Sequence, residues 1–132
     1  MLLGEVGTYI VANSSYVEGT DLFYGFLPET PDNCLALYEL TSSPPDFTLG
    51  TDLPVFERPR IQMYVRNTSY STGRSAAETI WQLLTKISNQ DLTGVRYHRI
   101  QAISSVQFLS RDKNRRSTFT ANLDVTKVPS TP

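Results

Sequence analysis

Few side chains of this sequence are typical of nucleophilic or metal chemistry. Cys34 and His98 are the only cysteine and the only histidine among the 132 residues. A thiol nucleophile needs a base within hydrogen-bond reach, and a zinc site needs further ligands at a recognisable spacing, which this sequence lacks. We therefore interpret Cys34 as a buried apolar residue of a strand and His98 as a strand-end residue that is solvated or hydrogen-bonded. The alternative is a small enzyme that uses these two side chains as a nucleophile and its base.

The carboxylates are plentiful but scattered, and no pair has a spacing that marks acid–base catalysis. The nearest approach to a phosphate-binding loop is Ser71–Ser75, just before a helical stretch. It lacks the glycine pattern and the lysine of a P-loop, so we interpret it as an ordinary helix start. The sequence thus predicts a protein that is not an enzyme and uses no cofactor and no metal. The carboxylates considered are Glu39, Asp46, Asp52, Glu57, Glu78, Asp112 and Asp124.

The segment 111–116 is the one charge cluster of the chain, between two stretches with strand-like alternation. In the first interpretation it is a solvated hairpin tip, in which a carboxylate locally offsets the arginines. In the second it contacts an acidic protein surface. In the third it contacts DNA phosphates, with help from oligomerisation, because a net charge of −1 does not attract nucleic acid broadly. The candidate interface residues of this segment are Arg111, Asp112, Lys113, Arg115 and Arg116.

Length and composition predict a single domain, 1–132, without a membrane segment. A chain of this size fits one domain and can bury enough surface for one core. Charged residues make up only 19% of the sequence, and polar uncharged residues fill the difference, which suits contacts with neighbouring subunits as well as an ordinary soluble domain. No stretch reaches the roughly 18 consecutive apolar residues of a spanning helix, and the first residues lack the features of a secretory signal.

The elements that must position these side chains are organised around the stretch 59–90. Ile61, Met63 and Val65 alternate with polar residues, which predicts a strand with one apolar face. Ser71–Ser88 has apolar residues at helical spacing, which predicts an amphipathic helix capped by one of its first residues. A strand with one apolar face and a helix with one apolar stripe must bury both together. The stripe consists of Ala76, Ala77, Ile80, Leu83, Leu84 and Ile87.

The first half of the chain is expected to add a helix, a loop and a strand. Leu2–Asn13 has a helical apolar face. Ser14–Asn33 is loop-like but apolar, so we expect it to pack on this domain's own sheet or partly against another subunit. Cys34–Leu40 is an apolar run typical of a buried strand. Thr41–Glu57 is expected to be a long connection, because its prolines remove ladder donors, and such loops are often functional or ordered by a partner.

The last third of the chain is expected to form a long hairpin. Tyr97–Leu109 and Ser117–Val128 both alternate between apolar and polar residues, and the charged segment lies between them as the turn. Residues 129–132 are expected to be a frayed tail. The residues predicted to face the core are Ile100, Ala102, Val106 and Phe108 on the first strand and Phe119, Ala121, Leu123 and Val125 on the second.

Together these elements predict an α+β fold. We expect a single antiparallel sheet of about four strands, with helices packed on one face, which makes two layers. The opposite face of the sheet is expected to be polar and rich in Thr, Ser, Gln and Asn.

Several segments together resemble the minor-capsid and tail-terminator proteins of long-tailed bacteriophages, which act in head–tail joining and tail completion. The order and spacing of the segments match this family from the first predicted helix to Val128. The similarity lies in the succession of segments rather than in any single motif. The segments are Asp32–Tyr38 after Phe26–Pro28, Leu53–Arg66, the helix from Ser75 through Leu84, and Arg111–Leu123.

This resemblance implies a structural protein with a small α/β domain that assembles as a ring, commonly a hexamer. The ring caps the growing tail tube and presents a surface to the head connector, so the implied partners are copies of itself, the tail tube protein and the head completion protein. DNA would pass through the lumen without specific binding, and no membrane is involved. The implied location is the virion, at the head–tail interface, after assembly in the host cytoplasm.

Ring and partner contacts are expected at three places. These are the long connection Thr41–Glu57, the charged segment 111–116 and the polar face of the sheet. In the long connection the candidate interface residues are Phe47, Leu49 and Phe56. The alternative function is a small nucleic-acid-binding module that uses the polar sheet face and the basic tip, with Tyr64 and Tyr97 stacking on bases.

Overall fold

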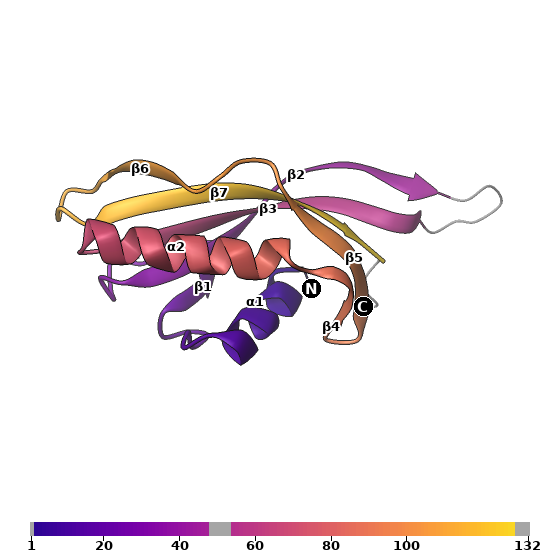
Figure 1. Ribbon diagram of the computed structural model, residues 1–132, viewed down its shortest axis with the longest axis horizontal. Helices are drawn as coiled ribbons and strands as arrows, with labels where there is room; N and C mark the ends of the chain where they lie inside the picture. Colours follow the sequence, from indigo (N-terminus) through magenta and orange to yellow (C-terminus); the bar gives the residue numbers. More distant parts are fainter. Residues whose placement is uncertain (1, 48–53, 129–132) are drawn as a thin grey trace.

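The structure of the chain is a computed structural model that describes residues 2–47 and 54–128, with only the backbone described for 41–47 and 54–55. The described part folds into one seven-stranded sheet and two helices (Figure 1). The strand order is β1-β2-β3-β7-β5-β4, and β6 also pairs with β7. The elements are α1 (Leu2–Asn13), β1 (Leu22–Tyr24), β2 (Cys34–Phe47), β3 (Pro54–Asn67), α2 (Tyr70–Thr85), β4 (Ser88–Leu92), β5 (Val95–Ala102), β6 (Gln107–Arg111) and β7 (Ser117–Lys127).

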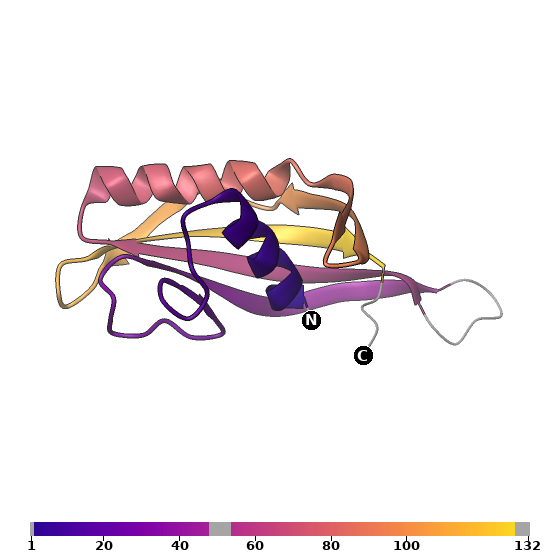
Figure 2. The same cartoon turned by 90° about the horizontal axis from the view of Figure 1, so that it is seen from below.

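The two helices cover one face of the sheet, as the α+β prediction requires. α2 runs along the strands and contacts β3, β5 and β7, whereas α1 contacts β1, β2 and β4 (Figures 1 and 2). Buried side chains of both helices join one apolar cluster with the inward residues of the sheet. The N-terminus of α2 is capped by Ser69, whose hydroxyl accepts a hydrogen bond from the backbone N–H of Thr72. Ser69 lies just before the positions predicted to cap this helix.

The core follows the predicted alternation of the two central strands. The register places Ile61 opposite Leu123 and Val65 opposite Phe119, and all four side chains are buried. Because successive residues of a strand point to opposite faces, this register gathers the apolar set of both strands under the helices. Of the predicted inward residues of the hairpin, Phe108 is the exception, since its side chain is 41% exposed. The buried residues of the α2 stripe are Ala77, Ile80, Leu84 and Ile87, the last just beyond the end of the helix.

The expected sheet of about four strands is wrong, because the sheet has seven. β1 lies inside the segment predicted as a loop, and β4 follows α2 directly. The expected long connection Thr41–Glu57 is also largely strand, since β2 continues to Phe47 and β3 begins at Pro54. The prolines are tolerated because β1 pairs only with residues 35–37 of β2. Beyond residue 37, β2 is an edge strand with register shifts. A proline there lacks a backbone N–H, but on the side without a neighbouring strand this interrupts no hydrogen bond between strands.

The predicted strand Tyr97–Leu109 is interrupted and forms β5 and β6. Both pieces pair with β7, so the hairpin prediction is confirmed with a break at residues 103–106. There the backbone N–H groups of Ile103 and Ser104 both donate to the carbonyl of Asn122. The Ser104 carbonyl accepts from the Trp81 indole, with Nε1 3.0 Å from the oxygen. The break therefore supplies the polar partner that a half-buried indole needs.

A charged cluster that the sequence patterns do not predict lies between α1 and the end of β7. Lys127 is 2% exposed, and its Nζ lies 3.7 Å from Glu5 Oε1 and 3.5 Å from Glu57 Oε2. The Tyr97 hydroxyl donates to Glu5 Oε1 over 2.7 Å. Burial and this hydrogen bond raise the pKa of Tyr97, so the phenol stays protonated as a donor. The cluster joins the N-terminal helix to the far end of the sheet.

Candidate interface surfaces

The turn between β6 and β7 is organised by one carboxylate. Asp112 accepts from the backbone N–H groups of Asn114 and Arg116, each over 2.9 Å, and from Arg116 Nε over 2.7 Å. The backbone N–H of Arg115 donates to the Asp112 carbonyl, and Arg115 has a positive φ of 62°. The charged segment is thus a built turn whose shape depends on Asp112, rather than a loose charged loop.

Arg116 does not present its charge on the surface, because its side chain is only 3% exposed. Besides Asp112, its guanidinium donates to the Glu29 carbonyl over 2.6 Å and approaches Asp32 Oδ1 at 3.3 Å. These acceptors lie more than 80 positions earlier in the chain, so no local pattern could have revealed them. Of the predicted interface residues in the turn, Arg116 therefore belongs to an internal network.

Arg66 of β3 completes the same network. Its side chain is also 3% exposed, and it donates to the backbone carbonyls of Pro31 and Asp32. The two arginines therefore tie the segment 29–32 to the ends of β3 and β7. This part of the predicted loop Ser14–Asn33 therefore packs on the chain's own sheet, which is the first of the two arrangements expected for it. Phe26, next to it, is 55% exposed.

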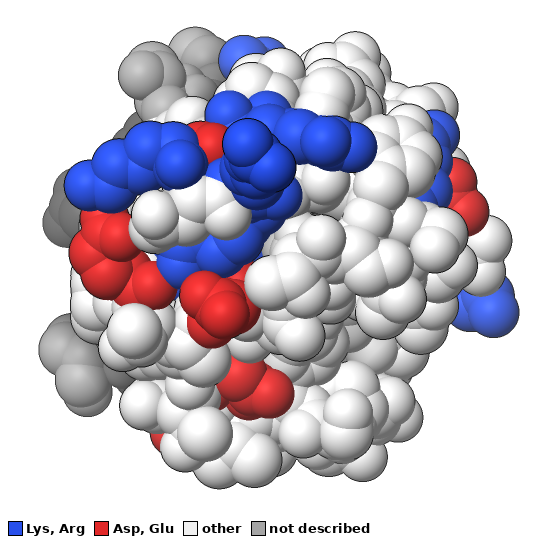
Figure 3. Space-filling view, turned by 90° about the vertical axis from the view of Figure 1, so that its left-hand side faces the viewer, with Lys and Arg blue, Asp and Glu red and all other residues white. Residues whose placement is uncertain are grey.

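Three basic side chains of the turn remain on the surface. Arg111, Lys113 and Arg115 are exposed, and Lys113 Nζ lies 4.0 Å from Glu29 Oε1. Figure 3 shows this end of the molecule, where Lys and Arg side chains gather beside several carboxylates. The surface carries both signs of charge, which suits contact with a protein of mixed charge better than a polyanion.

Replacing Asp112 by Asn is expected to destabilise the protein at neutral pH but not at low pH. Partial burial opposes its ionisation, but the hydrogen bonds from Arg116 and Asn114 outweigh this and hold the pKa of Asp112 below its usual range. A depressed folded-state pKa adds stability above the unfolded pKa of about 3.9, and this stability is lost as the pH falls through the folded value. Denaturant midpoints of both proteins at pH 7 and pH 3 measure the effect. A gap between the two proteins that persists at pH 3 would contradict this role.

Phe56, one of the predicted interface residues of the long connection, lies near the start of β3, at the opposite end of that strand from Arg66. The Phe56 ring packs edge-on against His98, with ring centroids 4.5 Å apart, and is half-buried. Phe47 is the last residue of β2, but its side chain is outside the described part, and Leu49 lies outside the described residues. Together β2 and β3 form a two-stranded arm that extends past the other strands (Figure 1).

The face of the sheet without helices is polar, as predicted. Its outward residues alternate with the core residues and are half-buried by their neighbours in the sheet. Tyr64 contacts Tyr38 edge-on at 6.4 Å between ring centroids, and the Thr120 hydroxyl donates to the Met63 carbonyl. The main outward residues are Arg60, Gln62 and Tyr64 on β3 and Thr120, Asn122, Asp124 and Thr126 on β7.

The structure separates the residues of the two alternative hypotheses. Cys34 pairs with Arg66 at one end of β3, whereas His98 lies against Phe56 at the other end. Ten residue steps of strand put about 30 Å between them, so they do not form a nucleophile and base. Burial also raises the pKa of the Cys34 thiol, which keeps it protonated. Tyr97 is fully buried under the helices, so it does not stack on nucleic-acid bases.

Within 2–47 and 54–128, no group of three or more His, Cys, Asp or Glu side chains could hold a metal ion. Neither helix of the described part is long and apolar enough to span a membrane.

A family model described as "Bacteriophage tail terminator protein" matches residues 9–129. Among solved structures, the chain is similar to one from the "Virion of native gene transfer agent (GTA) particle", with a TM-score of 0.65 and 13% sequence identity, covering 97% of this chain and 95% of that one. No curated protein matches. The structural likeness supports the fold, and the family match covers all but the first residues of α1 and the last three residues.

Proposed function

The chain belongs to the bacteriophage tail terminator family, and on this premise we propose that it forms a ring at the head–tail junction. The chain is a structural component of the phage tail, as the resemblance noted above implied. In the proposal, the ring ends the polymerisation of the tail tube and joins the tube to the head connector. The observation that carries the proposal is the family match over residues 9–129.

A terminator must bind the end of a tube without offering another tube-like end. A head-to-tail contact between copies closes into a ring when the rotation between them closes. The chain has two different surfaces for such a contact, since the arm of β2 and β3 and the turn between β6 and β7 lie at opposite ends of its long axis (Figure 1). β2 beyond residue 37 and the outer side of β6 are also edge strands, which can pair with another chain.

The proposed partners are copies of the chain, commonly six, together with the tail tube protein and the head connector. The exposed turn residues Arg111, Lys113 and Arg115 remain our candidates for these contacts, together with Phe47, Leu49 and Phe56 of the segment Thr41–Glu57. DNA would pass through the lumen without specific binding, which agrees with the net charge of −1. The protein would be assembled in the host cytoplasm and would remain in the virion.

Deleting the gene from its phage is expected to give tail tubes that grow past their normal length and free heads that carry no tail. The reason is that the tube end then stays open to further tube subunits. Negative-stain electron microscopy of lysates measures tube length and head attachment. The control is the wild-type chain supplied from a plasmid, which should restore tailed particles. In these particles, a gold label on the chain is expected at the head–tail junction. Normal-length tails joined to heads without the chain would contradict the proposal, as would a label elsewhere on the particle.

A further inference from the structure

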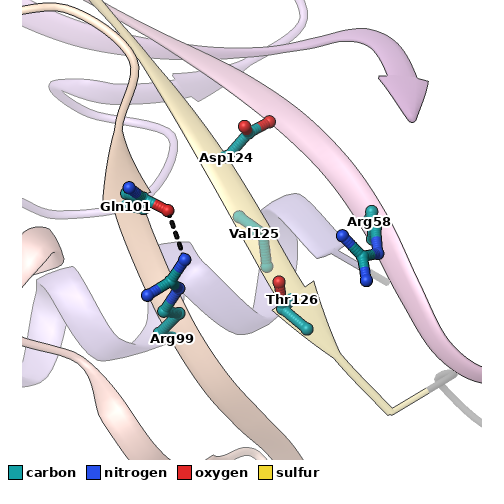
Figure 4. A pocket seen from close by; sticks show the side chains of 6 residues that line it. All are labelled: Arg58, Arg99, Gln101, Asp124, Val125 and Thr126. Atoms are coloured by element: carbon teal, nitrogen blue, oxygen red, sulfur yellow. Dashed lines mark hydrogen bonds between the residues drawn. The ribbon is translucent and has the colours of Figure 1, made fainter.

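The open face of the sheet carries a pocket that is too small for a whole ligand. Its volume is ≈ 80 Å³, whereas small-molecule sites occupy roughly 300–1,000 Å³. In its lining, Arg99 donates to Gln101 over 2.6 Å (Figure 4), and Asp124 is ion-paired with Arg60. These polar groups are engaged with each other, so the edges of the sheet offer a partner more than this face does. The lining residues are Arg58, Arg99, Gln101, Asp124, Val125 and Thr126.

Two stretches of strand edge are open in the described part of the chain. β1 covers only residues 35–37 of β2, and Pro44, which has no backbone N–H, limits regular pairing further along. Residues 38–43 of β2 are therefore open on one side. β6 pairs with β7 on one side, and all five of its residues are exposed. The backbone N–H and C=O groups of such edges are a template for a strand of another chain.

The two edges carry opposite charges on the same face of the sheet. Glu39 lies opposite the buried Ile61 of β3, so its side chain is on the helix side. Arg111 lies opposite Ser117 of β7, two positions from the buried Phe119, which puts Arg111 on the same side. Both side chains are exposed, and neither has an ion-pair partner among the described residues. Opposite charges that face each other across two antiparallel strands stabilise their pairing.

We propose that residues 39–43 of β2 pair with β6 of a second copy of this chain, with Glu39 opposite Arg111 of that copy. The inference rests on the ring of the proposed function and names the contact between neighbours in it. From β2 through β3 and β7 to β6 the strand direction reverses three times, so β2 and β6 run antiparallel. Copies placed side by side, with their helices on the same side, therefore bring these two edges together in the antiparallel orientation.

The offset between the two edges fits a closed barrel of tilted strands. Arg111 is level with Ser117 and Asn67, and continuing the register of β3 with β2 brings it level with position 33. Glu39 lies six positions further along β2, which is about 20 Å at the rise of a strand. Each copy contributes the four strands β2, β3, β7 and β6 between successive contacts, and four strands span about 19 Å. This offset gives a strand tilt of about 45°, close to the roughly 35–45° typical of barrels.

The direct test is a disulfide between the two edges. A full chain with Glu39→Cys and Arg111→Cys, and with Cys34→Ser, is oxidised as concentrated purified protein and in phage particles that contain it. Facing residues of antiparallel strands lie about 4.5–5.5 Å apart between Cα atoms, which is within the range of a disulfide. We expect a ladder of covalent multimers on a non-reducing gel, and reduction should return the monomer.

The matched controls are the two chains with a single introduced cysteine, which should give no ladder. The pair Glu39→Cys and Lys86→Cys should also give none, because Lys86 is exposed at the end of α2, away from β6. The absence of a ladder from both samples of the test chain would overturn the proposal. A dimer from Arg111→Cys alone would also overturn it, since β6 would then pair with its own copy, and so would a disulfide to another virion protein in place of the ladder.

Exchanging the charges tests which residues face each other. Glu39→Arg and Arg111→Glu each place like charges opposite each other, so each should weaken self-association in analytical ultracentrifugation about tenfold. In a mixture of the two variants, opposite charges meet at every contact between unlike copies, so association should recover. Lys86→Glu is the matched charge reversal and should change nothing. A mixture that fails to recover, although both variants keep the circular dichroism spectrum of the wild type, would contradict the pairing.

These readouts also separate the inference from the proposed function. A missing ladder, with the gold label still at the head–tail junction, would overturn the strand pairing and leave the ring in place. A ladder from chains whose label lies elsewhere on the particle would support the pairing and overturn the proposed position of the ring.

Discussion

Replacing Lys127 by Met is expected to lower the free energy of unfolding by about 3–5 kcal/mol, the usual cost of removing one partner from a buried ion pair. Lys127 is 2% exposed, and the side chain of its partner Glu5 is 6% exposed. Without the ammonium group, the buried Glu5 carboxylate would keep the hydrogen bond from the Tyr97 hydroxyl but would lose its ion pair with Lys127. The loss should be visible in urea or guanidinium denaturation followed by circular dichroism.

The double variant Glu5→Gln with Lys127→Met separates charge from packing. A neutral amide at position 5 can still accept the hydrogen bond of the Tyr97 hydroxyl, and Met fills most of the space of the lysine stem. We therefore expect the double variant to recover most of the stability that the single variant loses. A single variant within about 1 kcal/mol of the wild type would show that the buried cluster contributes little.

Replacing Gly73 by Ala is expected to destabilise the protein by about 1–3 kcal/mol, the usual cost of overpacking a core. In an exposed helix the same change would add about 1 kcal/mol of stability. At this position, however, a Cβ atom would lie 2.8 Å from the Phe119 ring and 2.8 Å from Asn67 Cβ. The Phe119 ring is fully buried and touches the rings of Tyr70 and Phe108, so it has no room to withdraw.

The matched control for this prediction is Ser75→Ala, two residues further along α2, where the side chain is exposed. This change should alter stability by no more than about 0.5 kcal/mol. Both variants are measured by the same denaturation experiment. A Gly73→Ala protein that is more stable than the wild type would contradict the prediction. It would mean that β7 and the start of α2 can move apart enough to make room for the added methyl group.

The internal charge networks have a common consequence for how this chain presents surfaces. Arg66 and Arg116 are buried against the segment 29–32, and Lys127 is buried against Glu5 and Glu57. These cations stabilise the fold rather than face a partner. By contrast, Arg111, Lys113 and Arg115 of the turn between β6 and β7 are exposed.

Much of the fold was predictable from local patterns. The alternation of Ile61, Met63 and Val65 marked the inward face of β3, and Phe119 to Val125 marked that of β7, because the period of two in a strand acts within a few residues. The α2 stripe was equally local. The short strands β1 and β4 had no such pattern, since three or five residues carry too little periodicity to be recognised.

The site was predictable only in outline. The charged turn was visible as a run of Arg, Lys and Asp, but the burial of Arg116 depends on Glu29 and Asp32, which the folded chain brings back to the turn. The prolines of β2 suggested a loop because the sequence does not say that this strand lies on an edge, where missing donors are tolerated. The pocket on the open face left no signal either, since its residues belong to three strands.

By itself, the sequence determined which faces of the long strands and of the second helix are apolar, and through the succession of its segments it indicated the family. These properties depend on residues a few positions apart, whose relative directions follow from the geometry of a helix or a strand. The tertiary structure alone decided which charges are buried and which side chains share a pocket. Arg58, Thr126 and Arg99 become neighbours only through the pairing register of β3, β7 and β5, and a shift of one residue in that register would turn one strand's set to the opposite face.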